Sequence, residues 1–576
     1  MKNRLITTNI SSLFSLNERN ILLGEWCIED KQKTDFDTLK YEKINYHFNK
    51  PGKLQTDFQY LNNLYPKILN SLIRFLNDYH ETKFSKRYWE IIIGPTLVQL
   101  LSVFWDRWEL IKNVSKNYDI NDVPIIEYVP SDFISQDFND IFTNKLDSHF
   151  WNNCVFSEII KDSFKLNISK IKNEYFKNKS FFVNQDLESS HRFKILDKIL
   201  SKFINPKEIL IYKLNLGKAN FFKYIFFQRR LSRSFSEFSK KIKIDCIKID
   251  RNFKLDFTIS NEFEKMLSKK ILLFFPLSHL EGFKQIQSEA IKIKLKPKYI
   301  VTAFGHVVND LFKVWLAETL EKNDSKLIIS SHGGYVENCI NFDSWINISD
   351  KFISWEKSNE KKIVQLPPLY LKTSNKDHSN KNNNILFCTS NTNLYAYRIQ
   401  DYIISSQIIE CLKLWENLFT TMNDKIKDKI VIRHVPNFDR WNQKEKLDKL
   451  FQHNALSQKK NFIDELKNSK IVINTAMQTT FFESMSFGVP SLVLLKYDLW
   501  NLSEKGKIIY EKLKENKIIF NDVKKLNEHL NEIAEEPNLW WNSQKILKIR
   551  EEFHDHYCKR ENFDQWNNFF NNLIFS

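Results

Sequence analysis

The fold is clearest in the segment Ile471-Val-Ile-Asn-Thr-Ala-Met-Gln-Thr-Thr-Phe-Phe-Glu-Ser-Met-Ser-Phe-Gly-Val-Pro-Ser-Leu-Val-Leu-Leu495. An apolar run of strand type is followed by a turn, a stretch with helical spacing, Gly-x-Pro and a second apolar run. This order indicates a strand–helix–strand unit and therefore a parallel sheet. Thr479 and Thr480 stand where the helix begins, and Glu483 follows about one turn later. Because backbone N–H groups and hydroxyls converge at a helix start, we expect these residues to bind a phosphate and Glu483 to reach a ribose.

The same alternation of strands and helices extends through most of the second half of the chain. Around the quoted segment, strands are predicted at 385–388, 430–433, 471–474 and 491–495, and helices at 398–420, 459–468, 479–487 and 502–515. Further upstream, strands are predicted at 271–275, 299–302, 326–330 and 351–354, with a helix at about 309–321. The polar stretch 372–384 has no apolar periodicity and is predicted to be a linker between two doubly wound α/β units.

The predicted domains follow from these patterns. Residues 1–270 are expected to form a helical or mixed region on the acceptor side, and 271–371 the α/β part that completes the N-terminal half. Residues 385–536 are expected to form the nucleotide-sugar-binding domain. Residues 537–576 are expected to be helices that pack back on the N-terminal half. The fold class is therefore α/β.

Polar residues follow several predicted strands. His332, Gly333 and Gly334 come directly after the strand at 326–330, where paired glycines allow the backbone to approach a ligand. His332 is suited to acid–base chemistry or to ligand contact because histidine titrates near neutrality. A glycine turn with an incidental histidine is the alternative.

A second strand end carries a cationic pair, Arg433 and His434. In open α/β sheets, ligands lie at the carboxyl ends of the strands. We therefore expect Arg433 to bind phosphate and His434 to add a hydrogen bond. A salt-bridged strand end is the alternative. Asp310, near another strand-to-helix turn, is expected to face the same cleft.

The N-terminal region contributes charged residues in aromatic surroundings. Glu25 lies in the motif Leu23-Gly-Glu-Trp-Cys27, and Asp106 and Arg107 lie between Trp105 and Trp108. A carboxylate here could act as a base or a nucleophile, with Glu25 as first choice and Asp310 as second. The alternatives are that Glu25 pairs with a buried base such as Arg107, and that Asp106 and Arg107 form an ion pair that organises the core.

Composition limits the class of protein. The 576 residues are 42% hydrophobic and 14% aromatic, which excludes global disorder and fibrous repeats, and the net charge of +16 favours anionic partners. Seven cysteines are scattered without a CxxC or a Cys/His cluster, so neither a disulfide framework nor structural zinc is predicted. No signal peptide is recognisable, and the apolar stretch 91–105 is short and interrupted by Gly94, Pro95 and Gln99. We therefore expect a cytoplasmic protein, with peripheral contact to the inner membrane as a further expectation.

The chain resembles a transferase family found in bacterial O-antigen and surface-polysaccharide gene clusters. The resemblance covers nearly the whole length. It is carried by Leu23-Gly-Glu-Trp-Cys, Tyr88-Trp-x-Ile-x-Ile-Gly-Pro, Asp106-Arg-Trp, His332-Gly-Gly, the Thr479-Thr-x-x-Glu segment, Trp540-Trp541 and Phe553-His-x-x-Tyr557-Cys558. The family has Gln-His-Gly-Gly-Gly-Tyr-Gly where this chain has Ser331-His332-Gly333-Gly334-Tyr335-Val336.

Two further similarities concern the C-terminal half. The pattern T-T-x-x-E-x-x-x-x-G-x-P matches the nucleotide-sugar segment of two-domain (GT-B) glycosyltransferases. The half is also distantly similar to capsule-type Kdo (3-deoxy-octulosonate) transferases, which use CMP-activated acidic sugars. These similarities imply a GT-B-like fold, in which two Rossmann-like doubly wound domains face a cleft.

The resemblance implies a glycosyltransferase of surface-polysaccharide biosynthesis that takes a sugar from a nucleotide-activated donor. A CMP-linked keto-acid sugar, such as Kdo or a nonulosonic acid, is the donor suggested by the Kdo transferases. The implied partners are a nucleotide-sugar donor and a glycan or lipid-linked glycan acceptor, without a metal or other cofactor; nucleic acid is not expected. The alternatives are a UDP- or GDP-sugar-using transferase or epimerase of the same pathway, and a non-catalytic nucleotide- or RNA-binding protein.

Overall fold

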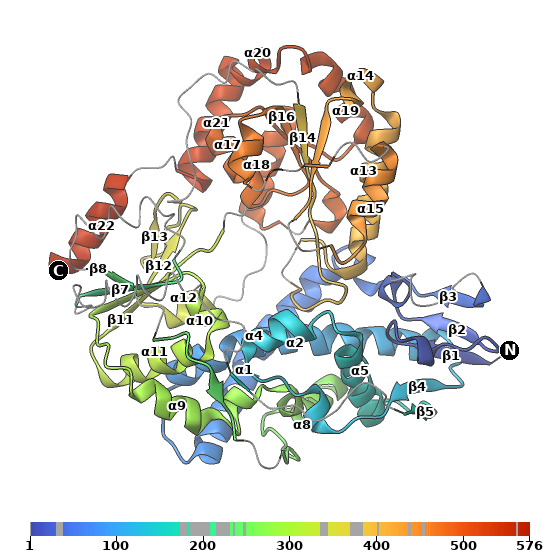
Figure 1. Cartoon of the computed structure of the whole chain (residues 1–576), viewed down its shortest axis with the longest axis vertical. Coiled ribbons are helices and arrows are strands. Elements are labelled where there is room, and N and C mark those ends of the chain that lie inside the picture. Colours follow the sequence, from blue (N-terminus) through green and yellow to red (C-terminus); the bar gives the residue numbers. More distant parts are fainter. Residues whose placement is uncertain are drawn as a thin grey trace.

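The computed structural model describes residues 2–29, 38–172, 182–183, 208–214, 231–233, 237–245, 249–333, 344–368, 384–399, 402–435, 439–451, 456–457, 459, 461–500, 502–559 and 563–575. It has three α/β parts, each built on parallel strands (Figure 1). The predicted linker at 372–384 lies outside the described residues except for Asn384.

The N-terminal part combines short parallel strands with long helices. Strands β1 (Asn3–Ile6), β2 (Arg19–Leu22) and β3 (Tyr41–Lys43) form one sheet, and β4 (Val123–Ile126) pairs with β5 (Ile168–Ile171). The helices include α1 (Lys53–His80), α2 (Lys86–Asn117), α3 (Pro130–Phe133), α4 (Phe138–Asp140), α5 (His149–Ser163) and α8 (Glu262–Lys270). The parallel sheet was not predicted, because its strands are only three or four residues long and leave little periodicity in the sequence.

Helix α2 is the central helix of this part. It is long and apolar enough to cross a membrane by length and composition, but 89% of that window is buried inside the protein. It packs against α1, α5 and the later helix α11 (Asp310–Lys322). This burial is what a core helix of a globular fold requires.

The second part, the first large α/β unit, contains a six-stranded parallel sheet. Its strands are β7 (Ile209–Tyr212), β8 (Leu231–Arg233), β10 (Tyr299–Thr302), β11 (Lys326–Ser330), β12 (Lys351–Ser354) and β13 (Ile363–Gln365), in the order β13-β12-β11-β10-β7-β8. The helices around it include α9 (Phe283–Ile291), α10 (Gly305–Val308), α11 and α12 (Ser344–Ile348). The predicted boundary at residue 271 therefore falls inside this unit, since β7 and β8 precede it.

The strand predicted at 271–275 is wrong. Residues Ile271–Phe274 form a 3₁₀ helix, η6, that continues α8. Its apolar side chains are almost all buried. A short buried apolar run does not by itself distinguish a strand from a helical turn, which explains the error.

The third part, the second large α/β unit, contains a five-stranded parallel sheet in the order β15-β14-β16-β17-β18. Its strands are β14 (Asn384–Cys388), β15 (Ile430–Arg433), β16 (Ser469–Asn474), β17 (Ser491–Leu494) and β18 (Ile519–Phe520). Its helices are α13 (Ile408–Thr421), α14 (Asp424–Lys427), α15 (Gln443–Asp448), α16 (Phe462–Leu466), α17 (Thr479–Phe487), α18 (Glu504–Glu515) and α19 (Val523–Ile533). The helix predicted at 398–420 begins only at Ile408.

Both large sheets are covered by helices on both faces, so the prediction of two doubly wound α/β units is confirmed. In β14, Phe387 packs against Trp415 and Phe419 of α13, whereas Leu386 belongs to the opposite core with Phe487 of α17. Strands covered in this way carry apolar residues at nearly every position, which is why they were recognisable in the sequence.

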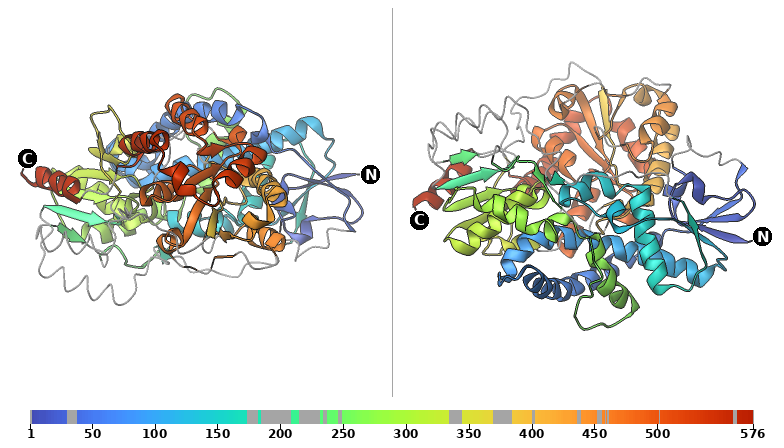
Figure 2. Two further views of the ribbon diagram at one scale, coloured as in Figure 1. Left: turned by 90° about the horizontal axis from the view of Figure 1, so that it is seen from above. Right: turned by 60° about the horizontal axis from the view of Figure 1, so that its bottom comes forward.

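The C-terminal helices divide between the two large units. α20 (Pro537–Trp541) and α21 (Gln544–Tyr557) pack on the second unit, where Phe553 contacts Phe481 and Phe482 of α17. α22 (Phe563–Phe575) returns to the first sheet, where Trp566 and Phe570 pack against its strands. The views in Figures 1 and 2 show α22 set apart from α21 and beside β7 and β8. The end of α21 also contacts this sheet, since Gln365 of β13 donates to the carbonyls of Asp555 and His556 at 3.0 and 3.2 Å.

Candidate functional site

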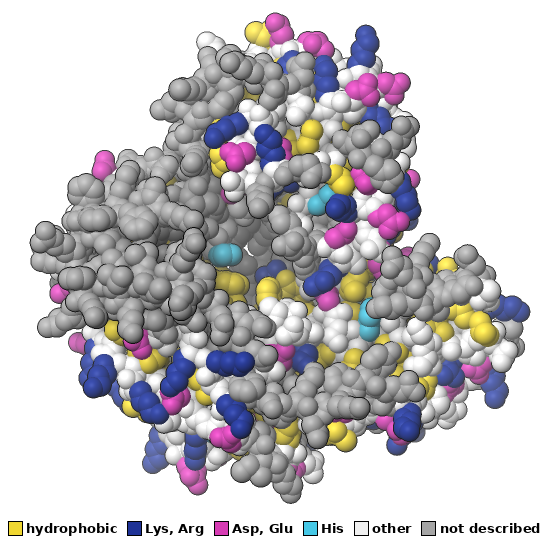
Figure 3. Space-filling view, in the orientation of Figure 1, with side chains coloured by type: hydrophobic (Ala, Val, Ile, Leu, Met, Phe, Trp, Pro, Cys, Tyr) yellow, Lys and Arg dark blue, Asp and Glu magenta, His cyan; other side chains and the backbone are white. Residues whose placement is uncertain are grey.

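The two large units meet at the carboxyl ends of their sheets. The loop after β11 brings Gly333 against the start of α17, where a Cβ atom on Gly333 would lie 2.8 Å from the Thr479 hydroxyl oxygen. Real Cβ atoms essentially never approach a neighbour so closely, so a side chain at residue 333 would force the Thr479 hydroxyl to move. Two motifs that are far apart in the sequence therefore form one site. In Figure 3 the surface is hollowed between the second unit and the rest of the molecule, with histidine and basic side chains around the hollow.

The start of α17 provides groups suited to an anion. Thr479 and Thr480 are its first two residues, and no side chain in the described part of the chain caps the helix start. Both threonines are partly exposed. The first N–H groups of a helix have no partner within the helix, and the helix dipole adds positive potential. Phosphate binding here stays a prediction.

Glu483 lies one turn further along α17, on the same face as Thr479 and Thr480. Burial raises the pKa of its carboxyl group to about 7, and the positive charge of Arg433 offsets part of that increase. Near neutral pH the side chain is thus a mixture of carboxylate and carboxylic acid, able to accept or donate a hydrogen bond.

Arg433 and His434 follow β15, as predicted. Arg433 donates from Nη1 to the carbonyl of Lys459 at 3.0 Å, and its guanidinium lies over the ring of Phe462. His434 Nδ1 lies 3.3 Å from the hydroxyl of Thr389. Among the described residues the buried Nε2 atom of His434 has no partner, and burial lowers the pKa of the ring. His434 is therefore neutral near pH 7 and has one ring nitrogen available for a ligand.

The strand order of the second sheet identifies its binding crevice. In the order β15-β14-β16-β17-β18, β15 is added on one side of β14, whereas β16, β17 and β18 are added in turn on the other side. The order in which the strands are connected therefore reverses between β14 and β16. Ligands of open α/β sheets bind outside the carboxyl ends at this reversal. Ser390 and Thr475 lie there, with their hydroxyl oxygens 2.8 Å apart, and Thr475 also donates to the carbonyl of Cys388 at 2.9 Å. These two residues were not predicted, because only the strand order shows which strand ends are adjacent.

His332 is held by an aromatic neighbour from the first unit. Its ring stacks on Phe304, which follows β10, with centroids 4.8 Å apart and planes 19° from parallel. Burial lowers the pKa of the imidazole, which favours its neutral form. Gly334 lies outside the described residues. The site thus combines His332 and Gly333 from the first unit with Thr479, Thr480, Glu483, Arg433 and His434 from the second.

Glu25 occupies a different place. It follows β2 in the N-terminal part and forms an ion pair with Lys43, whose Nζ lies 2.8 and 3.0 Å from the two carboxylate oxygens. Its side chain is 29% exposed. The suggested alternative partner, Arg107, pairs with Asp106 instead at 2.7 Å. Its predicted catalytic role stays a prediction, and no contact among the described residues joins it to His332 or Thr479.

Asp310 does not face the hollow as expected. It is completely buried, with a carboxylate oxygen 2.5 Å from Lys313 Nζ and another accepting from the backbone N–H of Phe138 at 3.1 Å. The Lys313 ammonium holds the pKa of Asp310 well below its usual range. Asp310 is the first residue of α11, and this helix start is packed against other elements. Its surroundings fit a structural ion pair.

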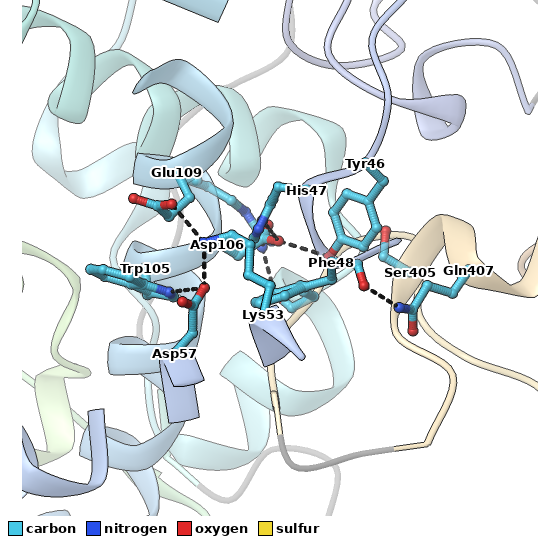
Figure 4. Close-up of polar contacts among 12 residues, drawn as sticks. Tyr46, His47, Phe48, Lys53, Asp57, Trp105, Asp106, Glu109, Ser405 and Gln407 are labelled. Atoms are coloured by element: carbon cyan, nitrogen blue, oxygen red, sulfur yellow. Dashed lines mark hydrogen bonds and ion pairs between the residues drawn. The ribbon is translucent and has the colours of Figure 1, made fainter. Parts of the chain in front are cut away.

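Asp106 and Arg107 form such a pair in the N-terminal part. Asp106 accepts from Tyr46 at 2.7 Å and lies 3.0 Å from His47 Nε2 (Figure 4). Arg107 also donates to Asn152 and to the carbonyl of Ala396, which belongs to the second large unit. The ion pair therefore organises the core, as the alternative reading had it, and also joins two parts of the molecule.

The fold and the site define an α/β protein whose two large parallel sheets bring their ligand-binding edges together. The family model described as LIC12162 family transferase matches residues 3–574. The chain belongs to this family of transferases. No curated protein matches the sequence.

One solved structure with similarity is that of WaaG, described as a glycosyltransferase involved in lipopolysaccharide biosynthesis. It is 8% identical, the match covers 64% of this chain and 100% of WaaG, and the TM-score is 0.30. A similarity of this size does not establish a shared fold. The fold assignment accordingly rests on the two sheets themselves.

Proposed function

We propose that this transferase is a glycosyltransferase of bacterial surface-polysaccharide biosynthesis that takes its sugar from a nucleotide-activated donor. The observation that carries the proposal is the contact between Gly333 and Thr479, which joins a glycine-containing strand end of one unit to a helix start of the other. Membership of a transferase family supports group transfer. A nucleotide-sugar has the phosphate and ribose that the residues around this contact suit.

Each residue of the site has a place in this proposal. The start of α17 binds the phosphates through Thr479, Thr480 and the backbone, and Glu483 hydrogen-bonds the ribose. Arg433 stabilises the negative charge that develops on the leaving phosphate. His332, whose pKa is lowered by partial desolvation and whose ring stacks on Phe304, positions the sugar or carries a proton.

The proposal includes catalysis without a metal ion, since helix-start N–H groups and Arg433 can neutralise the leaving phosphate. Among the described residues there is also no group of three or more His, Cys, Asp or Glu side chains that could hold one. Activity should persist in EDTA. Activity that disappears in EDTA and returns with Mg²⁺ or Mn²⁺ would contradict this part.

The test is calorimetric titration of the purified protein with CMP, UDP, GDP and their sugar conjugates. We expect one nucleotide class to bind, and the variant Thr480→Ala/Glu483→Ala to weaken its binding by about 1–3 kcal/mol, the scale of hydrogen bonds to charged groups. Binding of a CMP conjugate would support a keto-acid donor. The matched control is Thr420→Ala/Glu528→Ala, which changes two exposed residues of α13 and α19. Equal affinities for the site variant and the wild type would refute the assignment.

A further inference from the structure

The N-terminal part has its own reversal of strand order. The strands lie in the order β3-β2-β1 and β4-β5, and the backbone N–H of Leu5 in β1 donates to the carbonyl of Asp122, next to β4, at 2.9 Å. An isolated parallel bridge between Arg4 and Asp122 confirms that β4 lies beside β1. Along the chain, β2 and β3 are thus added on one side of β1, whereas β4 and β5 are added on its other side. Such a reversal marks a binding crevice at the carboxyl ends of the strands.

Two motifs meet at this edge. Thr7, Thr8 and Asn9 follow β1, and Gly24 and Glu25 follow β2. The N–H of Leu23 donates to the carbonyl of Ile6 at 3.0 Å, which extends the parallel register past the ends of both strands. The motif around Glu25, which the donor site does not use, therefore lies beside the polar residues after β1.

Buried polar atoms without partners gather there. Thr8 is 0% exposed and Asn9 is 6% exposed. The hydroxyl oxygen of Thr8 and both amide atoms of Asn9 have no hydrogen-bond partner among the described residues. By contrast, the adjacent Thr7 accepts from Asn153 Nδ2 at 3.0 Å. Leaving such a group without a hydrogen bond costs about 1–3 kcal/mol of stability. A ligand that supplies the missing hydrogen bonds would gain binding free energy at this position.

The chemistry of the edge suits hydroxyl groups rather than phosphate. Threonine and asparagine both donate and accept hydrogen bonds, and the carboxylate of Glu25 accepts them. The nearby cations are already paired, Lys43 with Glu25 and Arg107 with Asp106. The indole of Trp26, beside Gly24, is 1% exposed and packs against Tyr46 and Tyr395, so it borders the edge from the core side. Groups of this kind match the hydroxyl groups of a sugar.

The second large unit covers this edge. In the covering segment, which consists of residues 393–399 and 402–407, the ring of Tyr395 lies 5.3 Å from that of Trp26, and Gln407 donates to the carbonyl of Phe48 at 3.1 Å (Figure 4). Ile403 and Ser405 of this segment have φ angles of 61° and 50°, a conformation that non-glycine residues rarely adopt. Strain of this kind persists only where surrounding contacts enforce it, and it is common in ligand clamps.

The covering segment begins at the donor crevice. Tyr395 is only five residues beyond Ser390, which lies at the reversal point of the second sheet. Five extended residues span at most about 17 Å. Tyr395, at the N-terminal edge, therefore lies no more than about this distance from the donor crevice.

We propose that the edge formed by Thr8, Asn9 and Glu25 is a second ligand site that binds the hydroxyl groups of a saccharide, under the covering segment of residues 393–399 and 402–407. Its assignment as the acceptor site rests on the proposed function. The binding of a saccharide at this edge is independent of the proposed function.

The test uses the full-length protein and saturation-transfer NMR with methyl glycosides of common hexoses and N-acetylhexosamines. In Thr8→Val/Asn9→Leu, binding of the glycosides that the wild type binds should weaken at least tenfold, and Glu25→Gln should weaken it to a smaller extent. The melting temperature of the double variant should not fall, because the polar groups it removes have no protein partners. Its nucleotide affinity should equal that of the wild type.

Two control variants separate this site from its neighbours. Thr480→Ala/Glu483→Ala should keep glycoside binding. Lys170→Ala should also keep it, since Lys170 lines a different cavity, of about 460 Å³, at β4 and β5. The inference is overturned if the wild type binds no glycoside, if the double variant binds as well as the wild type, if the double variant melts lower, or if inorganic phosphate displaces the glycoside. Glycoside binding without any nucleotide binding would contradict the proposed function and support this site.

Discussion

At the scale of single residues, the donor site depends on side chains whose surroundings shift their ordinary chemistry. Partial desolvation lowers the pKa of the His332 and His434 rings, which favours their neutral forms. Arg433 is held by the carbonyl of Lys459 and the ring of Phe462, so its guanidinium is positioned before a ligand arrives. Such preorganisation is what stabilises charge as it develops in a transition state.

Arg433→Ala should therefore lower turnover more than it weakens donor binding, because the charge on the leaving phosphate grows in the transition state. The measurement compares kcat with the calorimetric Kd of the donor. Arg433→Lys keeps the positive charge but loses the paired N–H donors of the planar guanidinium. Its turnover should therefore lie between those of the alanine variant and the wild type. An alanine variant with unchanged kcat and a raised Kd would show that Arg433 only binds.

The raised pKa of Glu483 predicts that the stability of the protein depends on pH. Burial raises its pKa from 4.5 to about 7 in the folded protein, so folding disfavours the carboxylate form. Below the unfolded pKa the group is protonated in both states and costs nothing, and the cost grows as pH rises to about 7. Glu483→Gln should therefore raise the melting temperature at pH 8 and leave it unchanged at pH 4. The exposed Glu528→Gln is the control, and equal shifts at both pH values would contradict the prediction.

At the scale of elements, the ends of helices and strands build the site. α17 begins at the contact with Gly333 and ends at Gly488, whose φ angle of 88° lies in the left-handed region. The indole of Trp541 donates to the carbonyl of Gly488 at 2.9 Å, so this helix end is also anchored to α20. A glycine that ends a helix in this way sets the direction of the following strand.

Gly488→Ala should lower the free energy of unfolding by about 1 kcal/mol, because alanine is strained at positive φ. Urea denaturation followed by circular dichroism measures the change. Gly488→Asn should lose less, since asparagine tolerates the left-handed conformation. If alanine and asparagine behave alike, the conformation of residue 488 is not the cause.

At the scale of the whole molecule, several connections join the parts. α22 crosses from the second unit to the first sheet, where Trp566 is 3% exposed and donates to the carbonyl of Pro367 at 2.6 Å. On the opposite side, residues 393–399 and 402–407 dock on the N-terminal part. The geometry between the two sheets, and with it the contact of Gly333 and Thr479, depends on both.

Trp566→Ala should lower the free energy of unfolding by about 3–5 kcal/mol, the cost of truncating a large core side chain. Trp566→Phe keeps most of the packing and loses one hydrogen bond, so about 1 kcal/mol is expected. Chemical denaturation of both variants measures the two changes. Equal losses would mean that the hydrogen bond, rather than the packing of α22, dominates.

The sequence alone determined the two large α/β units and most of their strands, because buried parallel strands and the helices between them leave strong apolar patterns. It also determined the strand ends at which His332, Arg433 and Thr479 lie. It did not show the N-terminal sheet or β7 and β8, whose strands are short or lie in basic, aromatic sequence.

Only the tertiary structure decided which strand ends adjoin. It placed Gly333 against Thr479, buried Asp310 beside Lys313, and put Glu25 at the edge of a third sheet. The physical reason is that apolar periodicity records which face of an element is buried, whereas strand order and the packing of one unit on another depend on contacts between residues far apart in the chain.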